Sequence, residues 1–233
     1  MAAIARNGNT AERRFCEVLM VRQCLENHFR KPIRTIRLIP GRKKSDIQVE
    51  FMDDTLARIQ NKDGPGNNRG WSVDRRSVSR MPLDDVGKQL LDNVCLKKAG
   101  ERPVVERPAG LIHALLMGVD PEYTPHYFTH SIFHKETGEL LHLSIAPAER
   151  ILEALNETAY PQLVAKRTCV HISPLLYLQR KGGGAADASP NDIQLKLKSL
   201  PSSVMEPLYD RRNETPHNVN NDAVPEVEEG VLR

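Results

Sequence analysis

The sequence has little of several features that would mark particular protein classes. No stretch approaches the roughly eighteen uninterrupted apolar residues of a membrane-spanning helix, and residues 1–14 lack the apolar core of a secretory signal. The four cysteines, Cys16, Cys24, Cys95 and Cys169, form no Cys-x-x-C pair and have no histidine at ligand spacing beside them. We therefore expect reduced thiols rather than a zinc site, in an intracellular, cytoplasmic protein with no membrane partner.

Net charge is also small, at +3, but it is unevenly distributed. Residues 201–233 hold seven acidic and three basic side chains, a net charge of −4, so the preceding 200 residues carry +7. A basic body favours a polyanionic partner, although scattered Lys and Arg are also ordinary solubility charges. The apolar residues of the acidic segment 201–233 follow neither a helical nor a strand period, so we expect this segment to be a disordered tail.

Apolar periodicity in the rest of the chain predicts both helices and strands. Gly, Pro and Asn are dense in residues 63–70, which we expect to form a flexible loop. Segments 111–118 and 191–198 fit either a helix or a strand. The expected helices cover residues 10–29, 82–96 and 147–155, and the expected strands cover residues 34–39, 45–51, 55–61, 126–134, 139–145 and 169–179.

The two strands on either side of Met52-Asp53-Asp54 predict a hairpin whose register the apolar pattern decides. With a three-residue loop, all the apolar residues of the pair share one face, whereas a two-residue loop would mix the faces. The three-residue loop pairs Phe51 with Thr55, Val49 with Ala57, and Ile47 with Ile59. The polar face then brings Asp46, Gln60 and Lys62 together at the open end of the hairpin.

That cluster suits metal-dependent phosphodiester hydrolysis. Carboxylate and amide oxygens bind hard cations such as Mg²⁺, with Mn²⁺ as a substitute, and a lysine ammonium can orient or activate the attacking water. The segment SDIQVEF-MDD-TLARIQNK resembles the PD-(D/E)XK nuclease superfamily, and the type II restriction endonucleases in particular. The resemblance implies metal binding for Asp46 and Gln60 and the water-activating position for Lys62. Glu12 looks like the helix glutamate that many members direct at the same site.

Two positions depart from the family pattern. Ser45 stands where the signature has proline, and Gln60 stands where a carboxylate is usual. The second change removes one negative charge from the metal site. Glu12, or Glu50 on the same face of the hairpin, is a candidate to supply it.

Three further segments have residue types that suit contacts with double-stranded DNA. Residues 61–80 either track a phosphate backbone or form a mobile surface loop with Trp71 tucked into the core. The glycines after Lys181 lack the Lys-Ser/Thr of a nucleotide-binding loop, so we expect no nucleotide cofactor. The candidate DNA contacts are Arg42, Lys43, Lys44, Arg69, Arg75, Arg76, Gln179, Arg180 and Lys181.

We therefore expect an α/β fold with a mixed central sheet flanked by helices, like a restriction-endonuclease core. Residues 1–200 form the nuclease domain, with the catalytic core in 1–110 and a sheet extension for DNA recognition in 111–200. A two-fold homodimer would suit cleavage of both strands of a palindrome. The alternatives are a repair or junction-cleaving nuclease of the same fold, an inactive DNA-binding protein, and, less favoured, an RNA-processing nuclease.

Overall fold

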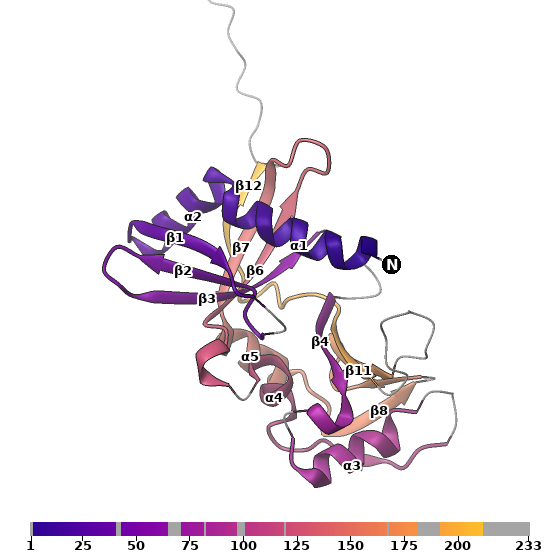
Figure 1. The fold of residues 1–233 in the computed structure, drawn as a ribbon. Helices are drawn as coiled ribbons and strands as arrows, with labels where there is room; N and C mark the ends of the chain where they lie inside the picture. Colours follow the sequence, from indigo (N-terminus) through magenta and orange to yellow (C-terminus); the bar gives the residue numbers. More distant parts are fainter. Residues whose placement is uncertain are drawn as a thin grey trace, which may run out of the picture.

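A mixed six-stranded sheet and an antiparallel six-stranded sheet make up most of the protein (Figure 1). The computed structural model describes residues 2–40, 43–64, 71–81, 83–96, 101–118, 120–166, 168–180 and 192–211, with the side chains of residues 2–9 and 74 excepted. The first sheet has the order β1 (Ile33–Leu38), β2 (Ile47–Phe51), β3 (Leu56–Asp63), β6 (Tyr127–Phe133), β7 (Leu140–Pro147) and β12 (Glu206–Asp210). The second has the order β4 (Trp71–Ser77), β11 (Asp192–Leu197), β10 (Leu176–Arg180), β9 (Cys169–His171), β8 (Gln162–Lys166) and β5 (Val105–Glu106).

Strands β3 and β6 run parallel, and every other neighbouring pair in the first sheet is antiparallel. The expected mixed α/β architecture with a mixed sheet is therefore confirmed. The helices of the described chain are α1 (Ala2–Glu17), α2 (Leu19–Phe29), α3 (Asp85–Val94), α4 (Leu111–Met117) and α5 (Ala148–Glu157), with short 3₁₀ turns at Val78–Arg80 and Pro121–Tyr123. None of these helices is long and apolar enough to cross a membrane.

Two hydrophobic cores cover opposite faces of the first sheet, because side chains alternate along its strands. Leu143 and Ile145 of β7 belong to the core beneath α1 and α2. Phe128 and Ala146 belong to the other core, which also contains α3, α4, α5 and the apolar face of the second sheet. The two sheets therefore share one packed interior.

The hairpin register is confirmed. Ile47 pairs with Ile59 and Val49 with Ala57, and the amide of Phe51 donates to the carbonyl of Thr55 at 3.0 Å. Asp54 in the three-residue loop has φ +64°, the left-handed conformation that such hairpin loops commonly use.

The predicted helix over 10–29 is two helices, because Val18 has extended backbone angles, φ −76° and ψ 117°. The break lets Phe15 of α1 and Leu25 of α2 both pack into the same core. Segment 111–118 is helix α4, and 191–198 contains strand β11. The predicted strand over 169–179 is divided into β9 and β10.

Two expectations about irregular segments are wrong. Residues 71–77, assigned to a loop, form β4 and pair with β11 from the far end of the chain. Residues 206–210, assigned to a disordered tail, form β12 at the edge of the first sheet. Both strands depend on partners distant in sequence, which local composition does not reveal. The remainder of the predicted tail, from 212, lies outside the described residues.

Candidate functional site

Asp46 is fixed at the open end of the β2–β3 hairpin by backbone bonds to the strands on either side. Its amide donates to the carbonyl of Ile59, and its carbonyl accepts from the amide of Ile39, both at 2.9 Å. Its carboxylate oxygen Oδ2 accepts from the amide of Asn61 at 3.1 Å. The carboxylate therefore has little freedom to rotate away from β3.

Lys62 lies on β3 beyond the residue that faces Asp46, and only 6% of its surface is exposed. Burial lowers the pKa of its ammonium group, and the negative charges of Asp46 and Glu12 oppose that shift. An ammonium group with little access to water needs nearby anions to stay charged. The carboxyl groups of Asp46 and Glu12 are close enough to favour the charged form of Lys62 when they are ionised.

Glu12 reaches the same cluster from helix α1. Burial, followed by the charge of Asp46, raises the pKa of the Glu12 carboxyl to about 7, and the charge of Lys62 opposes the rise. Burial also raises the pKa of Asp46 despite Lys62 and the amide of Asn61. Three elements thus bring two carboxylates and one ammonium group within electrostatic range, in a setting where the carboxylates ionise less readily than in water.

Gln60 lies on the polar face of β3, two residues before Lys62 and opposite Asp46, which directly precedes β2. It is only 3% exposed. Its Oε1 oxygen is buried and has no hydrogen-bond partner among the described residues. A buried, unpaired amide oxygen is costly and is suited to accept from a donor or to coordinate a cation.

The donor set therefore fits a hard cation in part. Glu12, Asp46 and Gln60 offer oxygen ligands, and a cation would relieve the crowding of the two carboxylates. Among the described residues, no group of three or more His, Cys, Asp or Glu side chains is arranged to hold a metal. That result agrees with the glutamine at position 60, which leaves the cluster with two carboxylates.

No sequence pattern indicated a role for Asn61. In the structure, this residue holds Asp46 and β3 in position. Its side chain points to the face opposite Lys62, where Oδ1 accepts hydrogen bonds from Thr129 Oγ1 at 2.9 Å and Ser131 Oγ at 3.0 Å. Its backbone amide holds Asp46. Asn61 thus joins β3 to β6 and to the catalytic candidate, a contact that depends on the parallel pairing of these strands.

Glu50 does not belong to this cluster. Arg34 Nη1 lies 2.9 Å from Glu50 Oε1, and Thr35 Oγ1 donates to its other oxygen at 3.3 Å. It pairs with Leu56 near the closed end of the hairpin. The prediction that Glu50 supplies charge to the metal site is therefore wrong: it shares a face with Asp46 but lies at the other end of the strand.

Two candidate DNA contacts are structural instead. Lys44 is buried, and its Nζ donates to the carbonyl of Leu115 in α4. Arg180 is 9% exposed and lies between Asp92, at 2.6 Å from Nη2, and the carbonyl of Cys95, to which Nε donates. Both cations satisfy groups of α3 or α4, so their assignment as DNA contacts is wrong.

The other described candidates are more accessible. Lys43 is exposed, with Nζ 3.7 Å from the centre of the Tyr123 ring. Arg75 lies on β4 with Nε 3.3 Å from Asp192, and Arg76 donates to the carbonyl of Arg80 at 3.2 Å. Gln179 is half-buried on β10. Arg42, Arg69 and Lys181 lie outside the described residues.

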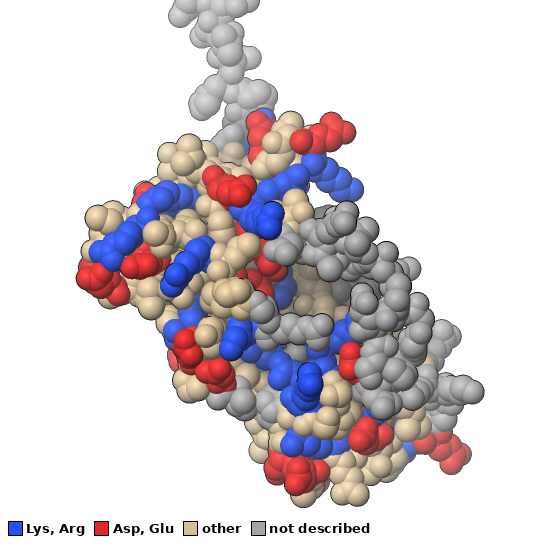
Figure 2. All heavy atoms as spheres, in the orientation of Figure 1, with Lys and Arg blue, Asp and Glu red and all other residues tan. Residues whose placement is uncertain are grey.

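Trp71 at the start of β4 connects the cluster to the second sheet. Its indole Nε1 donates to the carbonyl of Asp63, the residue after Lys62, at 3.1 Å. The indole also packs edge-on against His130, 5.0 Å between centroids. Figure 2 shows a hollow between the region around β1–β3 and the region around β4 and α3, with acidic and basic side chains next to each other inside it.

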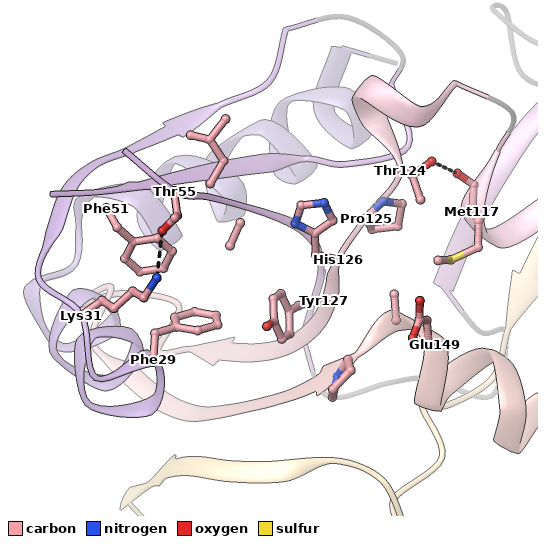
Figure 3. A pocket seen from close by; sticks show the side chains of 14 residues that line it. Phe29, Lys31, Phe51, Thr55, Met117, Thr124, Pro125, His126, Tyr127 and Glu149 are labelled. Atoms are coloured by element: carbon pink, nitrogen blue, oxygen red, sulfur yellow. Dashed lines mark hydrogen bonds between the residues drawn. The ribbon is translucent and has the colours of Figure 1, made fainter. Parts of the chain in front are cut away.

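A cavity of about 560 Å³ lies elsewhere, by the closed end of the hairpin. Phe29, Phe51, His126 and Tyr127 are among the residues that line it (Figure 3). Asp46, Gln60 and Lys62 are not among its lining residues. The charged cluster and this cavity, which has both polar and apolar lining residues, are therefore separate features.

Comparison with known proteins adds no family assignment. A scan against protein-family models found no match to the chain, and a search of curated proteins found no significant match.

Proposed function

We propose that the chain is a metal-dependent DNA endonuclease that hydrolyses phosphodiester bonds, and more specifically a sequence-specific type II restriction enzyme. One observation carries the proposal. Glu12 from α1, Asp46 before β2 and Lys62 on β3 form a partly buried cluster whose charges perturb one another's pKa values. Buried groups with strongly perturbed pKa values are a common mark of catalytic sites.

In this proposal Lys62 has the central chemical role. A lysine whose pKa is lowered by burial gives up its proton more readily than a lysine in water, so its neutral form can act as a base. A water molecule beside Lys62 attacks the phosphorus and passes a proton to Nζ. The new P–O bond forms as one ester P–O bond breaks, and the leaving oxygen takes a proton from solvent.

The acidic groups would bind the divalent cation that assists this step. Asp46, held by the amide of Asn61, and Glu12 would hold a divalent cation together with Oε1 of Gln60. A bound Mg²⁺ or Mn²⁺ supplies Lewis-acid stabilisation of the charge that develops on the phosphate. The carboxylates also oppose the burial effect on Lys62, so its proton affinity depends on the charge of the whole cluster.

The direct test is digestion of supercoiled plasmid and long phage DNA by purified protein, with Mg²⁺ and with a chelator. We expect magnesium-dependent cutting, and Asp46→Asn should abolish it. Glu50→Gln is the matched control, because it removes a carboxylate from the same hairpin face but far from the cluster. Equal cutting by wild type and Asp46→Asn would contradict the proposed site.

Gln60 favours one second candidate, a DNA-binding protein that has lost catalysis, because a carboxylate is usual at this position in the resembled family. That protein would bind DNA but cut nothing with either Mg²⁺ or Mn²⁺. A discrete fragment pattern from phage DNA would support a restriction enzyme. Cutting confined to branched or damaged substrates would support a repair or junction-cleaving nuclease.

A further inference from the structure

Strand β3 extends beyond the start of β2. The pairing of these two strands covers Leu56–Ile59, whereas β3 continues to Asp63 and pairs with β6 along that continuation. Residues 61–63 therefore have a strand neighbour on the β6 side and, within the described part of the chain, none on the β2 side. Lys62 lies in this half-paired stretch.

Two side chains bond the β2-facing edge of the stretch. Along a strand, the backbone groups of successive residues point to alternate neighbours, so Ile59, Asn61 and Asp63 share the β2 side. Asp46 Oδ2 accepts from the amide of Asn61 at 3.1 Å. Trp71 Nε1 donates to the carbonyl of Asp63, also at 3.1 Å. One residue of the charged cluster and one residue of the second sheet thus take backbone groups that an edge strand would otherwise leave unpaired.

His130 bonds the end of β3 from the other side. It is directly opposite Lys62 in the parallel register of β3 and β6. Its Nε2 donates to the carbonyl of Gly64 at 2.8 Å, and the amide of Gly64 donates to the carbonyl of Ser131 at 3.0 Å. The indole of Trp71 packs edge-on against the His130 ring, with 5.0 Å between centroids. Trp71 and His130 therefore hold both residues that follow Lys62.

Trp71 is itself anchored outside the cluster. Its backbone pairs with Leu197 of β11, and its ring packs against the core between the sheets. The position of the Asp63 carbonyl is therefore tied to the second sheet.

This anchorage bears on Lys62 because strand ends fray and because a catalytic group must be held within about 0.5 Å of its productive position. Lys62 is only 6% exposed. A displacement of its backbone would move Nζ relative to the carboxylates of Glu12 and Asp46, and the surrounding protein leaves little room for the side chain to compensate.

We propose that Trp71 is a positioning residue, which holds the β3 backbone so that Lys62 stays in place beside Asp46 and Glu12. The inference rests on the proposed function and deepens it, because it makes the second sheet necessary for a reaction at the first. Trp71 touches neither the phosphate nor the cation in this role. It acts through the carbonyl of Asp63.

The test uses the full chain carrying Trp71→Phe, which keeps an aromatic ring in the core and removes the indole N–H. This variant should lower the single-turnover rate of plasmid cleavage about tenfold. Its affinity for DNA, measured with a chelator present, should stay within about twofold of wild type. Val73→Ala is the matched control, because it removes buried volume from the same strand and no hydrogen bond. It should leave the cleavage rate within about twofold.

Hydrogen–deuterium exchange tests the backbone contact without any need for cleavage. In Trp71→Phe the amides of Asn61 and Gly64 should exchange about tenfold faster than in wild type, because the end of β3 opens more often. The amide of Phe51, bonded to the carbonyl of Thr55 at the closed end of the hairpin, is the internal reference and should not change. A benzothiophene side chain in place of the indole keeps the bicyclic shape without the N–H, and it replaces the phenylalanine variant if that variant does not fold.

The outcomes separate this inference from the nuclease proposal. If wild type and Trp71→Phe cut DNA equally fast, Trp71 does not position Lys62 and the nuclease proposal stands. A loss confined to DNA affinity, or equal losses in Trp71→Phe and Val73→Ala, also overturns the inference. If wild type does not cut, the nuclease proposal fails and the exchange rates alone decide whether Trp71 holds β3.

Discussion

The charged side chains at the two ends of the β2–β3 hairpin differ in their exposure to solvent. At the closed end, Arg34 binds Glu50 at 2.9 Å and Asp54 at 2.6 Å, and Lys31 binds Asp53 at 2.7 Å. These ion pairs are largely exposed, so solvent screens them and they contribute little to stability.

The charged groups at the open end form a partly buried cluster. Lys62 is almost fully buried, and both Glu12 and Asp46 have raised pKa values. The side-chain oxygen of Gln60 has no partner in the described part of the chain. Burying charged groups and leaving a buried oxygen unpaired lower stability, and buried groups with shifted pKa values are common at sites of chemistry or ligand binding. Both ends carry acidic and basic residues, and this difference in burial is the reason that we propose the open end as the site.

The largest difference between the two ends should be seen in a pair of identical substitutions. Lys62→Met should lower the cleavage rate at least a hundredfold, because it removes the proposed base while keeping an apolar stem of similar length. Lys31→Met removes the same charge at the closed end and should leave the rate within about twofold. Single-turnover cleavage of a plasmid measures both. Comparable losses in the two variants would remove the contrast on which the site assignment depends.

Divalent cations should stabilise the protein through the open end only. A cation at about ten times its dissociation constant contributes about 1.4 kcal/mol, which corresponds to a rise in Tm of a few degrees for a chain of this size. We expect this rise with Mg²⁺ in wild type and in Glu50→Gln. Asp46→Asn should lose it, as read by differential scanning fluorimetry against a chelator. A rise that survives Asp46→Asn would mean that the cation binds elsewhere.

Substitutions at position 60 should change the affinity for the divalent cation, with a smaller effect than Asp46→Asn. Gln60→Glu adds a carboxylate to the cluster, so cation affinity should stay equal or rise. Gln60→Leu removes a ligand oxygen at similar volume and should lower cation affinity about tenfold. Titration calorimetry with Mn²⁺ gives the three affinities. Identical values would exclude a contact between Gln60 and the cation.

The smallest effect is expected at the closed end. A hydrogen bond from Lys31 and one from Thr55 lower the pKa of Asp53 from 3.8 to about 2. A lowered carboxyl pKa stabilises the fold above pH 3.8, and this contribution is lost as the pH falls toward 2. Asp53→Asn should therefore be slightly less stable than wild type at pH 5 and equal to it near pH 2. Urea midpoints at the two pH values measure the difference, and a gap that persists at pH 2 would assign it to something other than this carboxylate.

The hairpin was predictable because its information is local. Alternating apolar residues on two adjacent strands permit one register, which also aligns Asp46 with Gln60. The same reasoning placed Glu50 on the correct face of the sheet. It could not show that Arg34, from a different strand, would occupy its carboxylate.

The sequence by itself determined the mixed α/β class, the hairpin and its polar face, since each follows from periodicity within a few dozen residues. The tertiary structure decided which charged groups meet. It brought Glu12 toward Lys62, buried Lys44 and Arg180 against helix carbonyls, and paired β4 with β11 to form the second sheet. These contacts join residues far apart in the chain, and their free energy depends on burial and on partners that no local pattern records.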